Sequence, residues 1–205
     1  MVDGLFVRFV VVSIARMDSR RLVLTVAGSF EMVLEQAQRS ESSGFDALYQ
    51  QLAGPVTAFA MARGASDPEG ITNDVFLQVF RNLGSFSGDE SDFRSWVFAI
   101  ARNRLIDAYR SSERRPKATR WTHADDRVVS SAERKALARL GNDRVADLLG
   151  RLTVEQREVI ALRIVADLPL AEVATIVGKP ISAVKRLQAR GLRRLQKEIL
   201  DEEVS

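Results

Sequence analysis

The chain has 205 residues, of which 46% are hydrophobic, and its 30 basic and 27 acidic residues give a formal net charge of +3. This length and apolar content allow one large or two small domains with their own cores. The absence of cysteine excludes disulfides, thiolate metal sites and cysteine nucleophiles, and it suits a reducing, cytoplasmic location.

The sequence offers little chemistry for catalysis. His123 is the only histidine, and it lies in the polar run TRWTHADD without a catalytic or metal-binding partner beside it. No glycine-rich phosphate loop of the type GxGxxG or GxxxxGK[ST] is present. We therefore expect no enzyme activity, no bound metal and no cofactor.

An apolar run, LFVRFVVVSIA, occupies residues 5–15. It is shorter than the roughly 20 residues of a membrane span, and Arg8 interrupts it. Asp3 is the first charge, so the basic start of a signal peptide is missing. We expect no stable membrane insertion, and we expect a protein that begins at Met17 to keep its function. Whether the run precedes the functional start, or packs as a strand or helix on the first domain, is left open.

Helical periodicity dominates the rest of the first half. Apolar residues recur at three- and four-residue spacing, which predicts helices over residues 30–39, 45–63, from Pro68 to about 83, and 91–110. Gly54 and Pro55 interrupt the second of these, and they predict either a new helix or a kink there.

Charge is distributed unevenly along this half. Residues 67–92 hold six acids against one arginine, whereas residues 94–115 hold six arginines against two acids. Opposite charge on neighbouring helices predicts different partners for them.

Residues 111–142 have few apolar anchors and contain Pro116, so a flexible linker with a helical second half is expected. About thirty residues could span up to roughly 100 Å when fully extended. Helical pattern returns over residues 145–152, 154–165, 170–177 and 181–200.

The strongest motif is LAEVATIVGKPISAVKRLQARGLRR, residues 170–194, which predicts a helix-turn-helix. Ala174 falls where two helices cross closely, and Gly178 falls at the turn, where a positive φ is needed. The apolar residues expected to pack the two helices together are Val173, Val177, Ile181, Val184 and Leu187.

The second helix of this motif is strongly basic. Residues 178–197 contain seven lysines or arginines and no acid, as expected of a helix that lies against DNA phosphates. Ser182, Lys185, Arg186 and Arg190 lie off the apolar stripe, so we expect them to face DNA. The alternative is a solvated basic face on a structural helical hairpin.

Together, the acidic amphipathic helix, the tryptophan-containing basic helix, the linker and the helix-turn-helix resemble a bacterial sigma factor of the extracytoplasmic-function type. The resemblance covers residues 45–197. Residues 67–86 resemble the polymerase-binding part of region two, whose common form is close to EDLVQETFLRAWR. This resemblance implies that the matching residues contact core RNA polymerase: Asp74, Phe76, Leu77 and Arg81. Gly70, Thr72 and Asn73 depart from this form.

The segment FRSWVFAIARNRLIDAYRSSERR, residues 93–115, resembles the part of region two that melts DNA at the minus-ten element. The family pattern is close to FxxWLxxIARNxxxDxxR. The resemblance implies minus-ten contacts by Trp96, Arg102, Asn103 and Arg110, with Asn103 at the position that meets a flipped base. Trp96 and Phe93 could equally be ordinary core residues.

Residues 152–195 resemble region four, which reads the minus-thirty-five element and typically has the form LPxxxRxVxxLRxxxGLSxxEIAxxLGxSxGxVK. Arg157, Glu172, Ala174 and Gly178 are among the matching positions. Leu187 stands where many relatives have an arginine, so the DNA contacts of those relatives cannot be copied at that position.

These observations predict an all-α protein of two small helical domains joined by a flexible linker. The expected boundaries are an N-terminal extension over 1–39, region two over 40–112, the linker over 113–142 and region four over 143–205. The implied function is a cytoplasmic sigma factor that binds core RNA polymerase and directs promoter binding, strand opening and initiation. Its implied partners are core polymerase and promoter DNA; whether an anti-sigma factor also binds is left open. The alternatives are an autonomous helix-turn-helix regulator and, least favoured, a Mg²⁺-dependent enzyme acting on nucleic acid.

Overall fold

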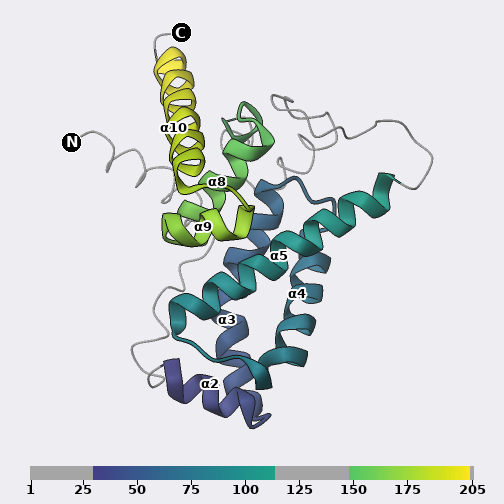
Figure 1. Ribbon diagram of the computed structural model, residues 1–205. Coiled ribbons are helices and arrows are strands. Elements are labelled where there is room, and N and C mark those ends of the chain that lie inside the picture. Colours follow the sequence, from purple (N-terminus) through teal and green to yellow (C-terminus); the bar gives the residue numbers. More distant parts are fainter. Residues whose placement is uncertain (1–29, 114–147, 204–205) are drawn as a thin grey trace.

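The computed structural model describes residues 30–113 and 148–203. These residues form helices joined by short loops, and no strand occurs within the two ranges. The first helical unit contains α2 to α5, and the second contains α8 to α10 (Figure 1). The predicted all-α fold with two small helical domains is therefore confirmed. The apolar run at residues 5–15, His123 and residues 114–142 of the predicted linker lie outside the described residues.

The first unit begins with α2 (Phe30–Gln38), which packs against α3 (Ser42–Ala62). Its buried residues Val33, Leu34 and Ala37 join the same core as those of α3. The sequence-based boundary after residue 39 assigns α2 to an N-terminal extension, whereas in the structure this helix helps to cover the core of the first unit.

The helix α3 runs through Gly54 and Pro55 without ending. Leu52, Val56 and Phe59, on both sides of the proline, are at most 1% exposed, so they form one continuous buried face. Burying each such side chain stabilises the fold by about 1.5–3 kcal/mol, and together they outweigh the roughly 3 kcal/mol cost of an internal proline. Of the two predicted alternatives, a new helix at this point is wrong.

The next helix, α4 (Pro68–Asn82), begins at the predicted proline. Asp67 caps it, because its carboxylate accepts the backbone N–H of Gly70 at 3.0 Å. A short 3₁₀ turn, η1 (Leu83–Ser85), then leads through a loop to α5 (Glu90–Glu113). The two helices with opposite charge balance thus lie in contact with each other.

The core between α3, α4 and α5 is rich in aromatic side chains. Phe59 and Phe98 meet edge to face, with ring centroids 5.6 Å apart, and both are fully buried. Phe93 contacts Phe86 in the same way at 5.2 Å. These rings fix the position of α5 relative to α3 and to the loop that precedes α5.

The second unit contains α8 (Val154–Ile164), α9 (Leu170–Val177) and α10 (Ile181–Glu203). Thr153 and Gln156 form a reciprocal capping box at the start of α8, with hydrogen bonds of 3.2 and 3.3 Å. Thr153 follows Leu152 at the position where the resembled region-four pattern has proline, and it caps the helix with its side chain.

The turn between α9 and α10 has the predicted geometry. Gly178 has a φ of 68°, in the left-handed region that glycine adopts without strain. Four of the five residues expected to pack the two helices together are buried: Val173, Val177, Val184 and Leu187. The helix-turn-helix is therefore formed as predicted.

For the fifth expected packing residue, Ile181, the prediction is wrong. Its side chain is 45% exposed, although the apolar spacing predicted it at the helix contact. Ile181 is the first residue of α10, so it lies before the turns that carry Val184 and Leu187 onto α9. Helical periodicity identifies the face of a helix, but it does not say where along that face the contact begins.

A glycine also lets α10 approach α8 closely. A Cβ atom added at Gly191 would lie 2.6 Å from Cδ1 of Ile160, which is shorter than any normal contact. This close crossing holds the middle of α10 against α8 and leaves its opposite side open to solvent.

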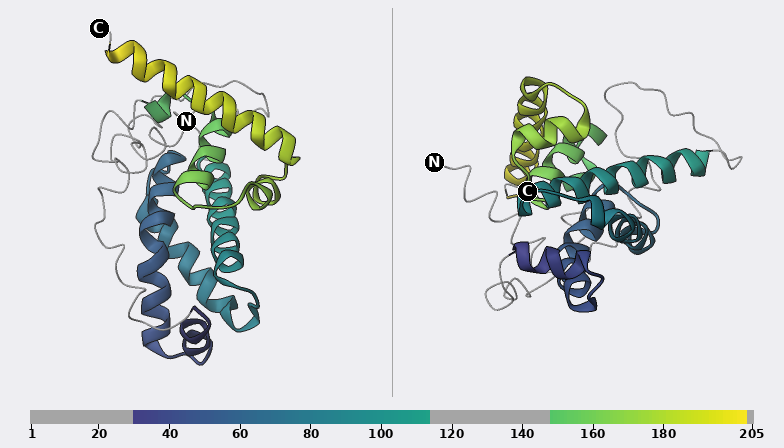
Figure 2. Two further views of the ribbon diagram at one scale, coloured as in Figure 1. Left: turned by 90° about the vertical axis from the view of Figure 1, so that its left-hand side faces the viewer. Right: turned by 60° about the horizontal axis from the view of Figure 1, so that its bottom comes forward.

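The two units are packed against each other. α8 contacts α3, and α9 contacts α5. Both views in Figure 2 place the second unit against the α3–α5 bundle, away from the end of the bundle that carries α2. Residues that the sequence assigns to separate domains therefore meet across one interface.

Candidate nucleic-acid and polymerase interfaces

The predicted DNA-reading residues of α10 share one exposed surface. Ser182, Lys185, Arg186 and Arg190 are all exposed, and their spacing of three and four residues places them side by side on the helix. The opposite side carries the buried Val184. The structure therefore brings these four residues together, as a helix that enters a DNA groove requires.

The basic surface of α10 continues beyond the four predicted residues. Arg193, Arg194 and Lys197 are also exposed, and α10 has no acidic residue before Glu198. Arg193 and Lys197 extend the row of Arg186 and Arg190 at helical spacing. A positive surface of this length suits contacts with successive phosphates.

The predicted minus-ten residues divide between two sides of α5. Trp96, Asn103 and Arg110 are spaced by seven residues, or two helical turns, so they lie on one side over about 21 Å. Arg102 is rotated by about 100° from Asn103, and it points toward the second unit. There its Nε donates to Oε1 of Glu158 at 3.1 Å. The structure thus brings three of the four residues into line and separates the fourth.

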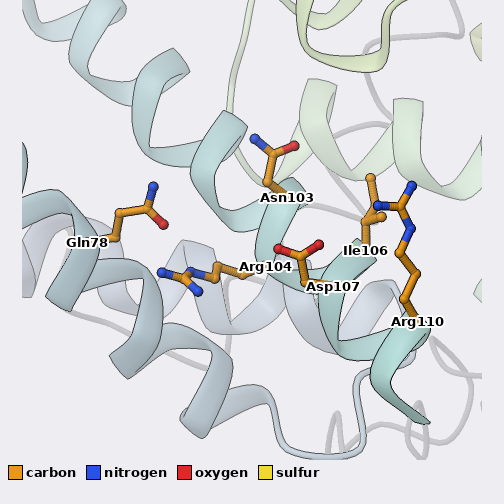
Figure 3. A pocket seen from close by; sticks show the side chains of 6 residues that line it. All are labelled: Gln78, Asn103, Arg104, Ile106, Asp107 and Arg110. Atoms are coloured by element: carbon orange, nitrogen blue, oxygen red, sulfur yellow. The ribbon is translucent and has the colours of Figure 1, made fainter. Parts of the chain in front are cut away.

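Asn103 and Arg110 line one hollow between α4 and α5, with a volume of about 520 Å³ (Figure 3). Gln78 of α4 and three further residues of α5 complete its wall. The three are Arg104, Ile106 and Asp107. Amide, guanidinium and carboxylate groups therefore surround a space that can accept a polar planar group such as a base. Gln78 and Arg104 were not among the predicted site residues, because their place in the hollow depends on how the two helices pack.

The structure separates the roles of the two aromatic residues at the start of α5. Phe93 is 1% exposed and belongs to the core, so the core interpretation holds for it. Trp96 is only partly buried and stacks on Phe86, with ring centroids 5.1 Å apart and an interplanar angle of 26°. One face of the Trp96 ring therefore packs on Phe86, while part of the side chain stays accessible to solvent.

The predicted polymerase-binding residues lie on α4. Asp74, Leu77 and Arg81 are exposed and share one side of the helix at spacings of three and four residues. Leu77 is 53% exposed, which leaves a large apolar side chain in solvent between two charged ones. Such a surface suits a protein partner.

Phe76, the fourth predicted polymerase-binding residue, is placed differently. It is 2% exposed and packs between Tyr49 and Phe80, with ring centroids 4.7 and 5.6 Å away. In this conformation it supports the exposed side of α4 from within the core. The sequence motif does not distinguish a residue that contacts a partner from one that positions such residues.

Within residues 30–113 and 148–203 there is no cluster of three or more acidic or histidine residues that could hold a metal ion. Over the same ranges, no helix is both long and apolar enough to cross a membrane.

Residues that sequence reasoning missed lie where the two units meet. Arg63, at the end of α3, is 3.5 Å from the same carboxylate oxygen of Glu158 that Arg102 contacts. Arg63 belongs to no quoted motif, and Glu158 is one of several charged residues on α8. Local sequence therefore carries no signal that could have paired them.

The fold and these surfaces define a class: a helical DNA-binding protein in which one unit carries a helix-turn-helix and the other a mixed aromatic and basic helix. The family profile described as Sigma-70 region 2 matches residues 48–115. The profile described as Sigma-70, region 4 matches residues 148–197.

Known relatives agree with these two matches. The extracytoplasmic-function sigma factor BldN of Streptomyces coelicolor is 34% identical over 173 residues, which cover 83% of this chain and 66% of BldN. The sigma factor SigK of Mycolicibacterium vanbaalenii is 29% identical over 187 residues, which cover 84% of this chain and 90% of SigK.

Among solved structures, that of CnrH in complex with the cytosolic domain of CnrY matches with a TM-score of 0.59 and 26% identity. The match covers 83% of this chain and 96% of CnrH. The chain belongs to the sigma-70 family of RNA polymerase sigma factors, and within it to the extracytoplasmic-function type. It is accordingly a sigma factor and not an autonomous helix-turn-helix regulator.

Proposed function

We propose that this sigma factor works through three separate surfaces and has no catalytic activity of its own. The exposed side of α4 binds core RNA polymerase, the line of Trp96, Asn103 and Arg110 on α5 opens the minus-ten element, and α10 reads the minus-thirty-five element. RNA polymerase supplies the chemistry, and the protein acts with it in the cytoplasm.

The observation that carries this proposal is the line of three different groups on one side of α5. The ring of Trp96 can stack on an unpaired base, and base–aromatic stacking contributes about 1–3 kcal/mol per base. The amide of Asn103 can pair with a base edge in the hollow, and Arg110 can bind a phosphate. Opening a duplex costs a few kcal/mol, so contacts of this size can offset it.

The surface on α4 supports the division of labour. Leu77 and its charged neighbours lie on α4, whereas the proposed DNA-opening residues lie on α5, where two of them, Asn103 and Arg110, line the hollow. Polymerase can therefore hold α4 while DNA occupies α5, and linked modules gain most when both sites are engaged together.

A gel-shift titration with and without core polymerase tests the proposal. We expect weak binding of promoter DNA by the protein alone and tight, sequence-specific binding with core, because each DNA-reading surface is small. Run-off transcription from a genomic fragment library with purified core then identifies the promoters. Tight specific binding without core, or no initiation with core, would contradict the proposal.

A protein regulator is proposed as a further partner. CnrH was solved with a second protein, the cytosolic domain of CnrY, bound to it. We expect this chain likewise to have an anti-sigma factor, which would hold it away from polymerase. Purification of the tagged chain from its host, with added core as competitor, should show a bound protein that core displaces.

A further inference from the structure

Two arginines of the first unit converge on one carboxylate of the second. Arg63 Nη2 lies 3.5 Å and Arg102 Nε lies 3.1 Å from the same oxygen, Oε1 of Glu158. The side chains of Arg63 and Glu158 are only 8% and 9% exposed. The Arg102 side chain is 24% exposed, so the carboxylate and one of its two arginines are shielded from water, unlike the groups of a surface ion pair.

Arg63 is held by both units. Its Nη1 donates to the backbone carbonyl of Val154 in the second unit at 3.2 Å. Arg63 caps the C-terminus of α3, and its carbonyl accepts a hydrogen bond from the hydroxyl of Tyr109 on α5. This bond fixes the end of α3 against the helix that carries Arg102. The Nε of Arg63 is buried without a hydrogen-bond partner in the part of the chain that the structure describes, so its guanidinium has an unused donor. The arginine pair is a site that Glu158 fills incompletely.

Two guanidinium groups directed at one anionic oxygen are a common arrangement for binding phosphate. Arg102 is the residue next to Asn103, which lies in the hollow on the proposed DNA-opening side of α5. A single strand that places a base near Asn103 would bring its backbone within reach of the neighbouring side of the helix. A phosphate there would meet Arg102 and Arg63 together.

We propose that Arg63 and Arg102 form a binding site for a backbone phosphate of the opened promoter strand, and that Glu158 occupies this site as an internal anion when the two units are docked. The inference rests on the proposed function and deepens it. Docking of the units and binding of the strand are then mutually exclusive, because both use the same guanidinium groups.

The rest of the docking interface combines polar contacts with unsatisfied groups. Arg157 Nη1 of the second unit donates to the carbonyl of Ala62 at 3.5 Å, and Ser91 Oγ lies 3.3 Å from Glu172 Oε1. The second carboxylate oxygen of Glu172, and the hydroxyl of Ser95 one turn further along α5, are buried without a hydrogen-bond partner among the residues that the structure describes. A buried polar group without a partner is less favourable than a hydrated one, so separation of the units would hydrate the Glu172 carboxylate.

The first test is the affinity of the full-length protein for a fluorescent 12-nucleotide oligo(dT), measured by anisotropy. Glu158→Gln keeps the size of the side chain and removes its charge, so we expect about tenfold tighter binding. The matched control is Glu155→Gln on the same helix, because Glu155 pairs with Lys179 at 2.8 Å inside the second unit. Its binding should equal that of the wild type.

The second test removes each arginine in the Glu158→Gln background. Arg63→Gln and Arg102→Gln should each weaken binding about tenfold and reduce the slope of log affinity against log salt by about 0.7, as expected for one lost phosphate contact on a single strand. Arg63→Lys keeps the charge but lacks the planar guanidinium group, so it should give an intermediate loss of affinity. Arg39→Gln, at an exposed pair with Glu35, should change nothing. Circular dichroism confirms folding of each variant.

No gain from Glu158→Gln overturns the inference. The inference is also overturned if the double variant Arg63→Gln, Glu158→Gln binds oligo(dT) as well as Glu158→Gln does. Arg63 would then make no contact with the bound strand. Run-off transcription by the wild-type protein with core separates this result from failure of the proposed function. Initiation by the wild type together with unresponsive variants overturns the inference alone, whereas no initiation with core overturns the proposed function.

Discussion

The two helical units of this sigma factor have cores of different chemistry. The first packs phenylalanines such as Phe59, Phe93 and Phe98 at its centre. The second has no aromatic residue within its described range, 148–203, and its core consists of aliphatic side chains such as Leu162, Val173 and Val184. Both units are helical and small, so their helices alone do not explain the difference.

This difference matches the two tasks proposed for the units. Opening a duplex requires flat apolar surfaces on which bases can stack, and the aromatic core of the first unit continues outward through Phe86 to the partly exposed Trp96. Reading a closed duplex requires a charged helix of fixed orientation, which aliphatic packing beneath α10 provides. The same division predicts which substitutions damage which task.

The largest effect is expected from Phe98→Ala in the aromatic core. Because Phe98 is fully buried against Phe59, its removal should lower the free energy of unfolding by about 3–5 kcal/mol. Urea denaturation followed by circular dichroism measures this loss. Met32→Ala, at a side chain that is 54% exposed, should change it by no more than about 0.5 kcal/mol. A loss below 1 kcal/mol for Phe98→Ala would show that the aromatic core is not tightly packed.

The combined change Lys185→Ala and Arg186→Ala tests the duplex-reading face of α10. Loss of a base contact should weaken the free energy of DNA binding by about 1–3 kcal/mol at one base pair. Loss of a phosphate contact should reduce the slope of log affinity against log salt by about one unit. Initiation with core should fall at promoters that need a minus-thirty-five element and persist at those that do not. Arg151→Ala in the same unit, where Arg151 pairs with Glu198 at 3.1 Å, serves as the control. Equal initiation by the double variant and the wild type would place the DNA-reading face elsewhere.

Asn103→Ala tests the side of α5 that carries Trp96, Asn103 and Arg110. It should make strand opening less favourable by about 1–2 kcal/mol, a smaller effect, because one neutral hydrogen-bonding group is lost. We expect reduced strand opening and relaxed preference at one minus-ten base, measured by permanganate footprinting, with core binding unchanged. Leu77→Ala should show the reverse: weaker core binding with the same base preference. If Asn103→Ala opened the promoter normally and kept its base preference, the residue would have only a structural role.

An effect of similar size, but on stability alone, is expected from Gly178→Ala at the turn before α10. A Cβ atom there would meet nothing within 4 Å, so only the positive φ opposes it, at a cost of about 1–2 kcal/mol in stability. Gly84→Ala gives the matched comparison, because its Cβ also meets nothing within 4 Å and its φ is not positive. Thermal denaturation should therefore show a clear loss of stability for Gly178→Ala and a change of no more than about 0.5 kcal/mol for Gly84→Ala.

The sequence by itself determined the helices, the turn at Gly178, the start of α4 at Pro68 and the exposed basic face of α10. Each of these depends on residues within a few positions of one another, through periodicity, capping or backbone preference. The family resemblance also followed from local motifs, and the two family profiles confirm it.

Only the tertiary structure decided that Phe76 is buried, that Ile181 is exposed and that Arg102 points away from Asn103 toward Glu158. Arg102 and Glu158 are 56 residues apart, and no local pattern records which side chain a distant helix will present to its neighbour. The physical reason is that helix propensity and periodicity act within a few turns, whereas the choice of partner across an interface depends on how whole helices pack.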